Sequence, residues 1–308
     1  MLQEKTENDV IGRNHWTKKG DVSLFLWQKV VSESVNIKNT VLFVHGSSMA
    51  SQPTFDLQVE GRPFSSVMNY FALKGYDTWC VDMEGYGRSD KTRKINCDIA
   101  TGVDDLATAC AYIQNIRNCG PICIYGISSG ALRAALFAQQ FPEYVSRLAL
   151  DAFVWKGSES PTLKKRKRKI KEFLKNNRRP IDQEFIQSIF SRDHSDCADP
   201  KVIDAFASAI CSLDDSVPTG TYVDMCLNLP LVDPKKVTAP IIIMRGQFDG
   251  IASMKDLLNF FSALPNSEKQ FTIMPGISHA SFQQKNYLMV YDILENFFSR
   301  PSPVFLDS

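Results

Sequence analysis

A serine between two glycines is the residue of this chain best placed to act as a nucleophile. The pentapeptide GISSG at residues 126–130 follows an apolar run and precedes an Ala-rich run. On a sharp turn from strand to helix, the Ser128 hydroxyl would be exposed at the N-terminal end of the helix. The residues two positions before and after it must be small, because strand and helix come close together there. Gly126 and Gly130 meet this requirement, so the pattern predicts a nucleophilic serine.

A nucleophilic serine needs a base, and the chain has four histidines. His279 follows an apolar run at 270–274 and precedes the last helix-like segment, a loop from which an imidazole can reach a serine at the edge of a sheet. His15 lies before the regular pattern begins, which favours a structural role. His45 ends a predicted strand, where its backbone matters more than its ring. His194 is interpreted as a solvated loop residue, since no second His or Cys stands at metal-ligand spacing. His279 is therefore the predicted base.

The imidazole needs a carboxylate to hold its tautomer and to stabilise its charged form. Asp249 follows the apolar run 241–245 and lies 30 residues before His279. The two strands that these residues follow would be neighbours in a sheet. Asp249 is the preferred acid. Asp151, after the run 145–150, is the alternative acid or a hydrogen-bonding group beneath an insertion.

The oxygen of a tetrahedral intermediate needs hydrogen-bond donors. One is expected to be the backbone N–H of Ser129, which follows the nucleophile at a helix N-terminus. The second is expected in the loop after the strand predicted at 40–45, where Gly46 permits a close turn. The backbone N–H of Ser47 is the preferred donor, with Ser48 as the neighbouring possibility.

The elements that must position these residues alternate along the chain. Short apolar runs, expected to be strands, occur at 22–31, 40–45, 76–82, 121–127, 145–150, 240–245 and 270–274. Segments with helical spacing occur between them at 64–73, 104–116, 130–140, 254–263 and 282–298. This alternation predicts an α/β fold with a mostly parallel, doubly wound sheet and functional groups at the carboxyl ends of its strands. Residues 156–232 interrupt it with charged, helix-like segments, which predicts an all-helical insertion.

These motifs together resemble the α/β-hydrolase fold superfamily. The resemblance rests on the order Ser, Asp, His, on His45-Gly46, on DMEGYGRS at 82–89 and on the elbow at 126–130. It covers about residues 20–155 and 233–300, and it implies a core of residues 1–155 and 233–308 with a cap or lid at 156–232. Because haloalkane dehalogenases and most epoxide hydrolases of this fold carry aspartate at the elbow, Ser128 argues against both. The loop HGSSM at 45–49 also differs from those of proline iminopeptidases and of relatives of hormone-sensitive lipase.

The resemblance and the residues predict a serine hydrolase acting on a small-molecule acyl substrate: a carboxylic ester, thioester or lactone. A C–C bond hydrolase or another lyase-type reaction on the same triad is the alternative. A rival of another class is a ligand-binding receptor that keeps the fold without turnover. No metal and no organic cofactor are implied. Apolar side chains of the insertion are expected either to roof an acyl pocket or to hold the insertion to the core: Trp155, Phe185, Ile189 and Phe190.

Composition and charge limit the other classes of function. The 308 residues are 44% hydrophobic and 22% charged, and 35 Lys and Arg nearly cancel 34 Asp and Glu. No apolar run approaches the ~20 residues that span a bilayer, and the first ten residues, MLQEKTENDV, lack the apolar stretch of a secretory signal. The eight cysteines form no CxxC pair, which favours reduced thiols. We therefore expect a cytoplasmic protein, while the oligomeric state stays open.

One segment departs from this balance. Residues 164–179 hold ten basic residues and one acid, a local net charge of +9. Three interpretations remain: a solvated face of the insertion, a funnel that attracts an anionic substrate, and a nuclear-localisation or nucleic-acid patch. Phe173 is the single aromatic residue in the segment, which disfavours nucleic-acid binding because stacking platforms are missing.

Overall fold

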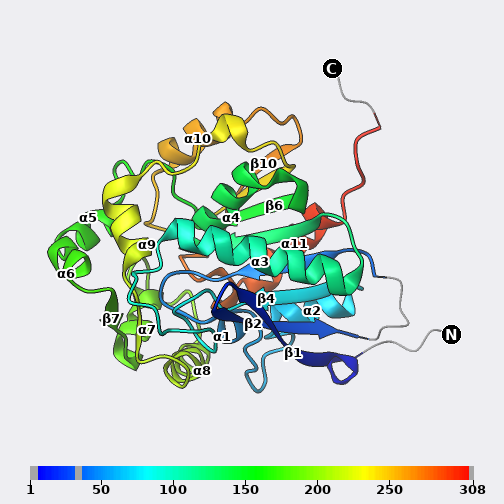
Figure 1. Ribbon diagram of the computed structural model, residues 1–308, viewed down its shortest axis with the longest axis horizontal. Coiled ribbons are helices and arrows are strands. Elements are labelled where there is room, and N and C mark those ends of the chain that lie inside the picture. The colour runs from blue at the N-terminus through cyan, green and yellow to red at the C-terminus, as the bar shows by residue number, and fades with distance from the viewer. Residues whose placement is uncertain (1–5, 32–36, 305–308) are drawn as a thin grey trace.

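The computed structural model describes residues 6–31 and 37–304 and is organised around one eight-stranded sheet (Figure 1). The outermost parts of the predicted core, 1–5 and 305–308, lie outside the described residues, as does 32–36. The strand order is β1-β2-β4-β3-β5-β6-β9-β10, and every pair from β4 to β10 is parallel. The strands of this sheet are β1 (Ile11–Lys19), β2 (Val22–Val30), β3 (Thr40–Val44), β4 (Asp77–Val81), β5 (Ile122–Ile127), β6 (Val145–Asp151), β9 (Ile241–Gly246) and β10 (Lys269–Met274).

The central strands are buried along their whole length. All residues of β3 (TVLFV), β4 (DTWCV) and β5 (ICIYGI) are buried. Because helices cover both faces of a parallel sheet, its strands appear in sequence as continuous apolar runs instead of alternating ones. The predicted fold class, an α/β fold with a mostly parallel sheet, is confirmed.

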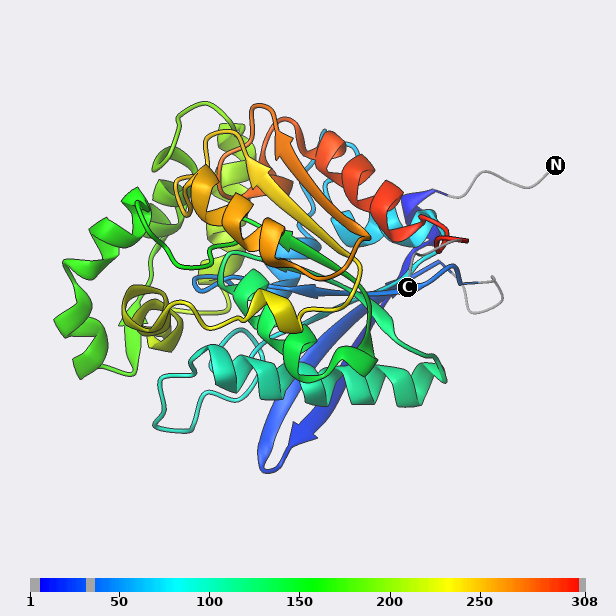
Figure 2. The same ribbon diagram turned by 90° about the horizontal axis from the view of Figure 1, so that it is seen from above.

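Helices form a layer on each face of the sheet. α3 and α4 pack against one face, and α2 and α11 pack against the other (Figure 2). The helices of the core are η1 (Glu7–Asp9), α1 (Ser51–Phe55), α2 (Val67–Leu73), α3 (Ile99–Arg117), α4 (Ser129–Gln140), η2 (Pro142–Tyr144), η4 (Pro234–Lys236), α10 (Met254–Ala263), η5 (Ser281–Gln283) and α11 (Tyr287–Phe298). None of the helices in the described ranges is long and apolar enough to cross a membrane.

The first strand of the sheet is not among the predicted elements. β1 pairs with β2 in antiparallel register, and residues on its outward face are exposed. An edge strand needs no apolar residues on its open face, so polar and basic side chains hide it in the sequence. β1 also holds His15, whose two ring nitrogens contact Tyr112 Oη and Gln28 Oε1, each at 3.1 Å.

Between β6 and β9 the chain leaves the sheet and forms a separate group of elements at one end of it (Figure 1). Its members are α5 (Pro161–Lys167), α6 (Ile170–Lys175), β7 (Arg178–Pro180), α7 (Gln183–Ser191), α8 (Pro200–Cys211), β8 (Ser216–Pro218), α9 (Gly220–Val223) and the π-helix η3 (Asp224–Asn228). We call residues 156–232 the insertion. It is not all-helical as predicted, because β7 and β8 pair as a short antiparallel ribbon. Strands of three residues are too short to give an alternating pattern in the sequence.

A single carboxylate fixes the chain where it enters the insertion. Asp256, in the first turn of α10, accepts hydrogen bonds from the backbone N–H groups of Trp155, Lys156 and Gly157 at 3.0–3.2 Å. Trp155 packs its ring against Phe260 of the same helix. The entry to the insertion is therefore held by the core helix α10.

Candidate active site

The turn between β5 and α4 has the geometry that a nucleophilic serine requires. Ser128 has φ 59° and ψ −120°, a conformation rarely adopted by residues other than glycine. A Cβ at Gly126 would lie 2.4 Å from the carbonyl oxygen of Gly130, and one at Gly130 would lie 2.3 Å from that of Val44. Both glycines are therefore required by the close approach of strand and helix. Backbone strain of this kind costs of order 1–3 kcal/mol and persists only where surrounding structure enforces it.

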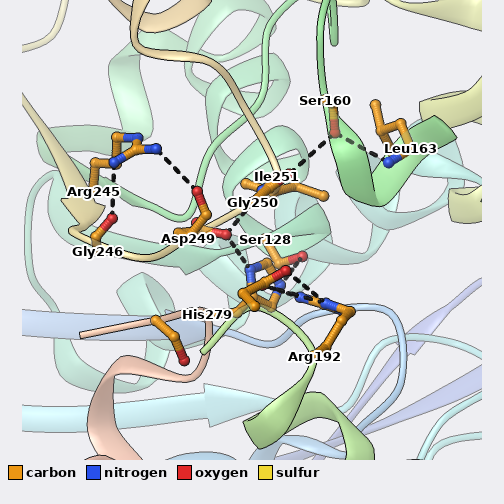
Figure 3. A network of polar contacts seen from close by, with 12 residues as sticks. Ser128, Ser160, Leu163, Arg192, Arg245, Gly246, Asp249, Gly250, Ile251 and His279 are labelled. Carbon is orange, nitrogen blue, oxygen red and sulfur yellow. Dashed lines mark hydrogen bonds and ion pairs between the residues drawn. The ribbon is translucent and has the colours of Figure 1, made fainter. Parts of the chain in front are cut away.

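The structure brings Ser128, His279 and Asp249 together in one hydrogen-bonded chain (Figure 3). The Ser128 hydroxyl lies 3.0 Å from Nε2 of His279, and Nδ1 of His279 lies 3.0 Å from Oδ1 of Asp249. All three side chains are buried, with exposed fractions of 6%, 5% and 2%. With Nδ1 donating to the carboxylate, Nε2 is left to accept the serine proton.

The acid is held by its own loop. Asp249 Oδ1 also accepts a hydrogen bond of 3.0 Å from the N–H of Ile251, and Arg245 donates to the Asp249 backbone oxygen at 3.0 Å. The loop begins at the carboxyl end of β9, which is the sheet neighbour of β10. The loop after β10 carries His279. Adjacent parallel strands thus deliver the base and the acid to the same edge of the sheet.

Asp151 occupies a different position at the end of β6. Its Oδ2 accepts a hydrogen bond of 2.7 Å from the Tyr125 hydroxyl, and its backbone oxygen accepts one of 2.9 Å from the N–H of Ser128. Within the described part of the chain, no hydrogen bond joins Asp151 to His279. Burial raises the pKa of the Asp151 carboxyl to about 7, and the nearby charge of Asp249 adds to this rise. The geometry favours a supporting role for Asp151 beneath the elbow.

The two residues predicted to supply oxyanion donors lie side by side. Ser47 Oγ donates a hydrogen bond of 2.7 Å to Ser129 Oγ, which joins the loop after β3 to the start of α4. Ser129 is the first residue of α4, where backbone N–H groups have no partner within the helix. A Cβ at Gly46 would make ordinary contact with Ser128 Cβ at 3.5 Å. The loop therefore lies against the serine side chain.

The ring of His45 does more than the sequence suggests. It is fully buried; its Nδ1 donates to the Gly46 oxygen at 2.8 Å, and its Nε2 accepts from the N–H of Met83 at 3.1 Å. Burial lowers the pKa of His45 to about 3, so the ring is neutral and can accept at Nε2. The imidazole thus joins the loop after β3 to segment 82–89. In that segment Asp82 accepts hydrogen bonds from the backbone N–H groups of Ser51 and Arg88.

Residues of the insertion complete a cavity above Ser128. The space between its walls, including the part that is open to solvent, is about 460 Å³. Core residues on its wall include Gly46, Ser47, Ser48, Ser128 and His279, and those from the insertion are Arg166, Ile189, Arg192 and Tyr222. Of the four apolar side chains expected to roof the pocket, Ile189 alone lies on this wall. Phe190 packs on Phe206 within the insertion, and Trp155 packs on α10.

The polar side of this wall was not identified from the sequence. Arg179 Nη2 donates to Ser48 Oγ at 2.7 Å, and the Tyr222 hydroxyl lies 3.3 Å from the same oxygen. Burial alone would raise the pKa of Tyr222, but the charges of Arg166 and Arg179 outweigh it and lower the pKa to about 7. In the sequence, only the basic composition of 164–179 indicated a charged wall. It did not show which of the basic side chains turn toward the cavity.

Asp193 of the insertion lies close to the triad. Its carboxylate pairs with Arg192 at 3.0 Å, and oxygen or nitrogen atoms of Asp193, Asp249 and His279 lie within 4.8 Å of one another. Such a group could bind a metal ion; in the structure His279 bonds to Asp249 Oδ1 and Asp193 pairs with Arg192, while Asp249 Oδ2 has no hydrogen-bond partner among the described residues. His194, the next residue, is exposed and stacks on Phe248 at 3.8 Å between ring centroids. This contact places the loop after α7 against the loop of the acid.

Comparisons with known proteins agree with this architecture. A family model described as serine aminopeptidase, S33 matches residues 35–286. Among solved structures, a soluble variant of monoglyceride lipase from Saccharomyces cerevisiae in complex with a substrate analog has a TM-score of 0.70 at 17% identity, covering 94% of this chain and 95% of that one. E-2-(acetamidomethylene)succinate hydrolase has a TM-score of 0.69 at 17% identity, covering 94% and 100%. A thermophilic esterase from Thermogutta terrifontis has a TM-score of 0.65 at 18% identity, covering 93% and 99%.

Identities this low show a shared fold and do not identify a substrate. No curated protein matches the chain in sequence.

Proposed function

The chain belongs to the serine aminopeptidase S33 family of α/β-hydrolases, and from this membership we propose that it cleaves a carboxylic ester, thioester or lactone through an acyl-enzyme on Ser128. The observation that carries the proposal is the pair of 3.0 Å hydrogen bonds from Ser128 to His279 and from His279 to Asp249. A serine hydroxyl is a weak nucleophile, and a hydrogen-bonded imidazole oriented by a carboxylate is the arrangement that activates it. The strained backbone of Ser128 supports the same interpretation, because strain of this kind clusters at functional sites.

The reaction follows from these positions. Ser128 Oγ attacks the carbonyl carbon while its proton passes to His279 Nε2, and Asp249 stabilises the resulting imidazolium. The carbonyl oxygen becomes an oxyanion that accepts hydrogen bonds from the backbone N–H groups of Ser47 and Ser129. His279 then returns the proton to the leaving alcohol or thiol as the bond to carbon breaks. Water attacks the acyl-enzyme by the same steps and releases the acid and the free Ser128 hydroxyl.

The proposal also assigns a role to the insertion. Residues 156–232 act as a lid over a core formed by 1–155 and 233–308, and they contribute one wall of the substrate cavity. The wall supports this division, because Arg166, Ile189, Arg192 and Tyr222 come from the insertion while the triad comes from the core. The bond-breaking groups and the groups that select the substrate thus come from different segments.

Labelling with a fluorophosphonate probe tests the nucleophile. Wild-type protein should be labelled on the peptide that contains Ser128, and Ser128→Ala should not be labelled while keeping its fold by circular dichroism. Ser208→Ala, which changes an exposed serine of α8, is the matched control and should be labelled like the wild type. An unlabelled wild type would contradict the proposal and favour the non-catalytic, ligand-binding alternative.

A substrate panel then tests the bond that is cleaved. Esters of 4-nitrophenol with increasing acyl length, acyl-CoA thioesters and lactones should include substrates that turn over with dependence on Ser128. Turnover confined to substrates with a carbon–carbon bond between two carbonyl groups would instead identify the C–C hydrolase alternative.

A further inference from the structure

Three arginines of the insertion surround Tyr222 at the wall of the Ser128 cavity. We call Arg166 of α5, Arg179 of β7 and Arg192 after α7 the arginine cluster. Arg166 and Arg192 line the cavity together with Ser128 and Tyr222. Arg192 is drawn beside the triad in Figure 3, and it lines the same cavity as Ser128 and His279. Two of the three arginines thus share a cavity with the proposed nucleophile, and Arg179 contacts Ser48 on its wall.

The cluster has too few counter-charges. Arg192 pairs with Asp193 at 3.0 Å. Neither Arg166 nor Arg179 forms an ion pair with a carboxylate anywhere in residues 6–31 and 37–304. Arg166 lies over the Tyr222 ring at 4.1 Å, and its Nη1 lies 3.7 Å from the sulfur of Met225.

Arg179 is the more deeply buried of the two. It is 8% exposed, and its Nε has no hydrogen-bond partner. Its Nη2 donates to Ser48 Oγ at 2.7 Å, and the guanidinium lies over the rings of Phe185 and Tyr222 at 4.8 Å and 4.2 Å. Buried charges are normally paired, because a charge removed from water without a partner costs several kcal/mol. The hydrogen bond to Ser48 and the contacts with the two aromatic rings offset only part of this free-energy cost.

The local electrostatics favour a negative group at this position. Burial raises the pKa of a phenol, yet the charges of Arg166 and Arg179 bring the pKa of Tyr222 down to about 7. Burial also lowers the pKa of the Arg166 guanidinium from its ordinary value. Charges that lower the pKa of a buried phenol would equally stabilise a carboxylate or phosphate placed in the same cavity.

A second hollow leads from the cluster toward the basic helices of the insertion. It shares Arg166, Arg192 and Tyr222 with the Ser128 cavity. Its wall also carries Arg179, Lys165 and Lys169 with one acid, Glu172. The basic segment therefore divides into two parts. Most of its side chains are exposed on α5 and α6, while Arg166 and Arg179 turn toward the site.

From this arrangement we propose that the arginine cluster binds an oxyanion of the substrate, a carboxylate or a phosphate, while the acyl carbon lies at Ser128. The proposal rests on the proposed function, since it names the class of substrate that the same site hydrolyses. Guanidinium groups suit this role because their planar donors match the geometry of carboxylate and phosphate oxygens. The substrate class is therefore an anionic ester, thioester or lactone.

Two esters that differ in a single charge test the proposal. 4-Nitrophenyl hydrogen glutarate carries a terminal carboxylate, and methyl 4-nitrophenyl glutarate has the same chain and leaving group without the charge. Wild-type kcat/KM should be about tenfold or more higher for the charged ester, because a hydrogen bond to a charged group contributes more than a neutral one. No preference for the charged ester would overturn the proposal.

Variants of α5 then assign the preference to the cluster. Arg166→Met should lower kcat/KM for the charged ester by about 10- to 100-fold, mainly through KM, and change the neutral ester by less than about threefold. Arg166→Lys should restore part of the loss. Arg168→Met removes the same charge from an exposed position next to α5 and should leave both esters as in the wild type. Equal losses for both esters in Arg166→Met would show a packing role and contradict the proposal.

A binding measurement keeps this test separate from the test of catalysis. Glutarate or inorganic phosphate should raise the thermal unfolding midpoint of the wild type and of Arg168→Met but not of Arg166→Met, while dimethyl glutarate should not. A shift with glutarate alone identifies a carboxylate site, and a shift with phosphate alone identifies a phosphate site. If neither anion binds, the cluster proposal fails even when Ser128 is labelled. If an anion binds but Ser128 is neither labelled nor needed for turnover, the proposed function fails instead.

Discussion

Asp151 should make the free energy of unfolding depend on pH, and the substitution Asp151→Asn should remove this dependence. Its carboxyl is fully buried beneath the nucleophile elbow, where it accepts the Tyr125 hydroxyl at 2.7 Å. Burial raises its pKa from 3.8 to about 7. The folded protein therefore keeps a proton on Asp151 between about pH 4 and pH 7, while the unfolded chain loses it.

The sign and size follow from that difference. A group whose pKa is raised on folding contributes stability below its unfolded pKa, and this contribution is lost as pH rises through the folded pKa. A rise from 3.8 to about 7 corresponds to about 4 kcal/mol at ~1.4 kcal/mol per unit. Asp151→Asn keeps the shape and an acceptor for Tyr125 but cannot ionise. The stability of this variant relative to wild type should therefore increase by about 4 kcal/mol from low pH to above pH 7.

Unfolding free energies of both proteins, measured from about pH 4 to about pH 9, provide the assay. Asp249→Asn is the matched control for catalysis, because it makes the same change at the other strand-end aspartate. It should lower kcat by about 10³- to 10⁴-fold, whereas Asp151→Asn should retain turnover. Parallel stability curves for wild type and Asp151→Asn would refute the electrostatic reasoning. Loss of turnover in Asp151→Asn alone would reassign the acid.

Three further outcomes are expected from positions described above. Ser128→Gly should be more stable than Ser128→Ala by about 1 kcal/mol in thermal unfolding, because glycine relieves the strained φ; equal stability would argue against strain at the elbow. Gly130→Ala should destabilise by about 1–3 kcal/mol, since its Cβ would lie 2.3 Å from the Val44 oxygen, and an unchanged unfolding midpoint would contradict this. Tyr222, with a pKa of about 7, becomes anionic as pH rises and then competes for the arginine cluster. KM for 4-nitrophenyl hydrogen glutarate, measured relative to the neutral diester, should therefore rise through pH 7 in wild type and stay flat in Tyr222→Phe; identical profiles would contradict the competition.

The sequence predicts the fold of the core and the proximity of Ser128, His279 and Asp249, because local patterns indicate both. Buried parallel strands give continuous apolar runs, and a serine between two glycines at a strand end indicates a tight turn whatever lies elsewhere in the chain. The expected helix at 254–263 has the bounds of α10, and the strand at 270–274 differs from β10 by one residue. His279 and Asp249 could be chosen because each follows a strand.

Features that depend on distant contacts gave no such pattern. Nothing local distinguishes Arg166 from its exposed neighbours Lys165 and Lys167, because its direction is set by contacts with Tyr222 and Met225, far along the chain. Asp193 follows a helix and approaches the triad only because the insertion folds back over it. Tyr222 has an unusual pKa through two arginines that lie more than 40 residues away along the chain. The charges and short distances at this site therefore depend on the tertiary fold and leave no local pattern in the sequence.

Residues 249–256, a loop and the first turn of α10, contact both the core and the insertion. At one end Asp249 orients His279; at the other, Asp256 holds the backbone where the chain departs from β6. Between them the Gly250 oxygen accepts the Ser160 hydroxyl, which caps α5 (Figure 3). A movement of the insertion would act on the same eight residues, 249–256, that hold Asp249 against His279. We therefore expect that a shift of the insertion would change the position of Asp249 and with it the orientation of the His279 ring.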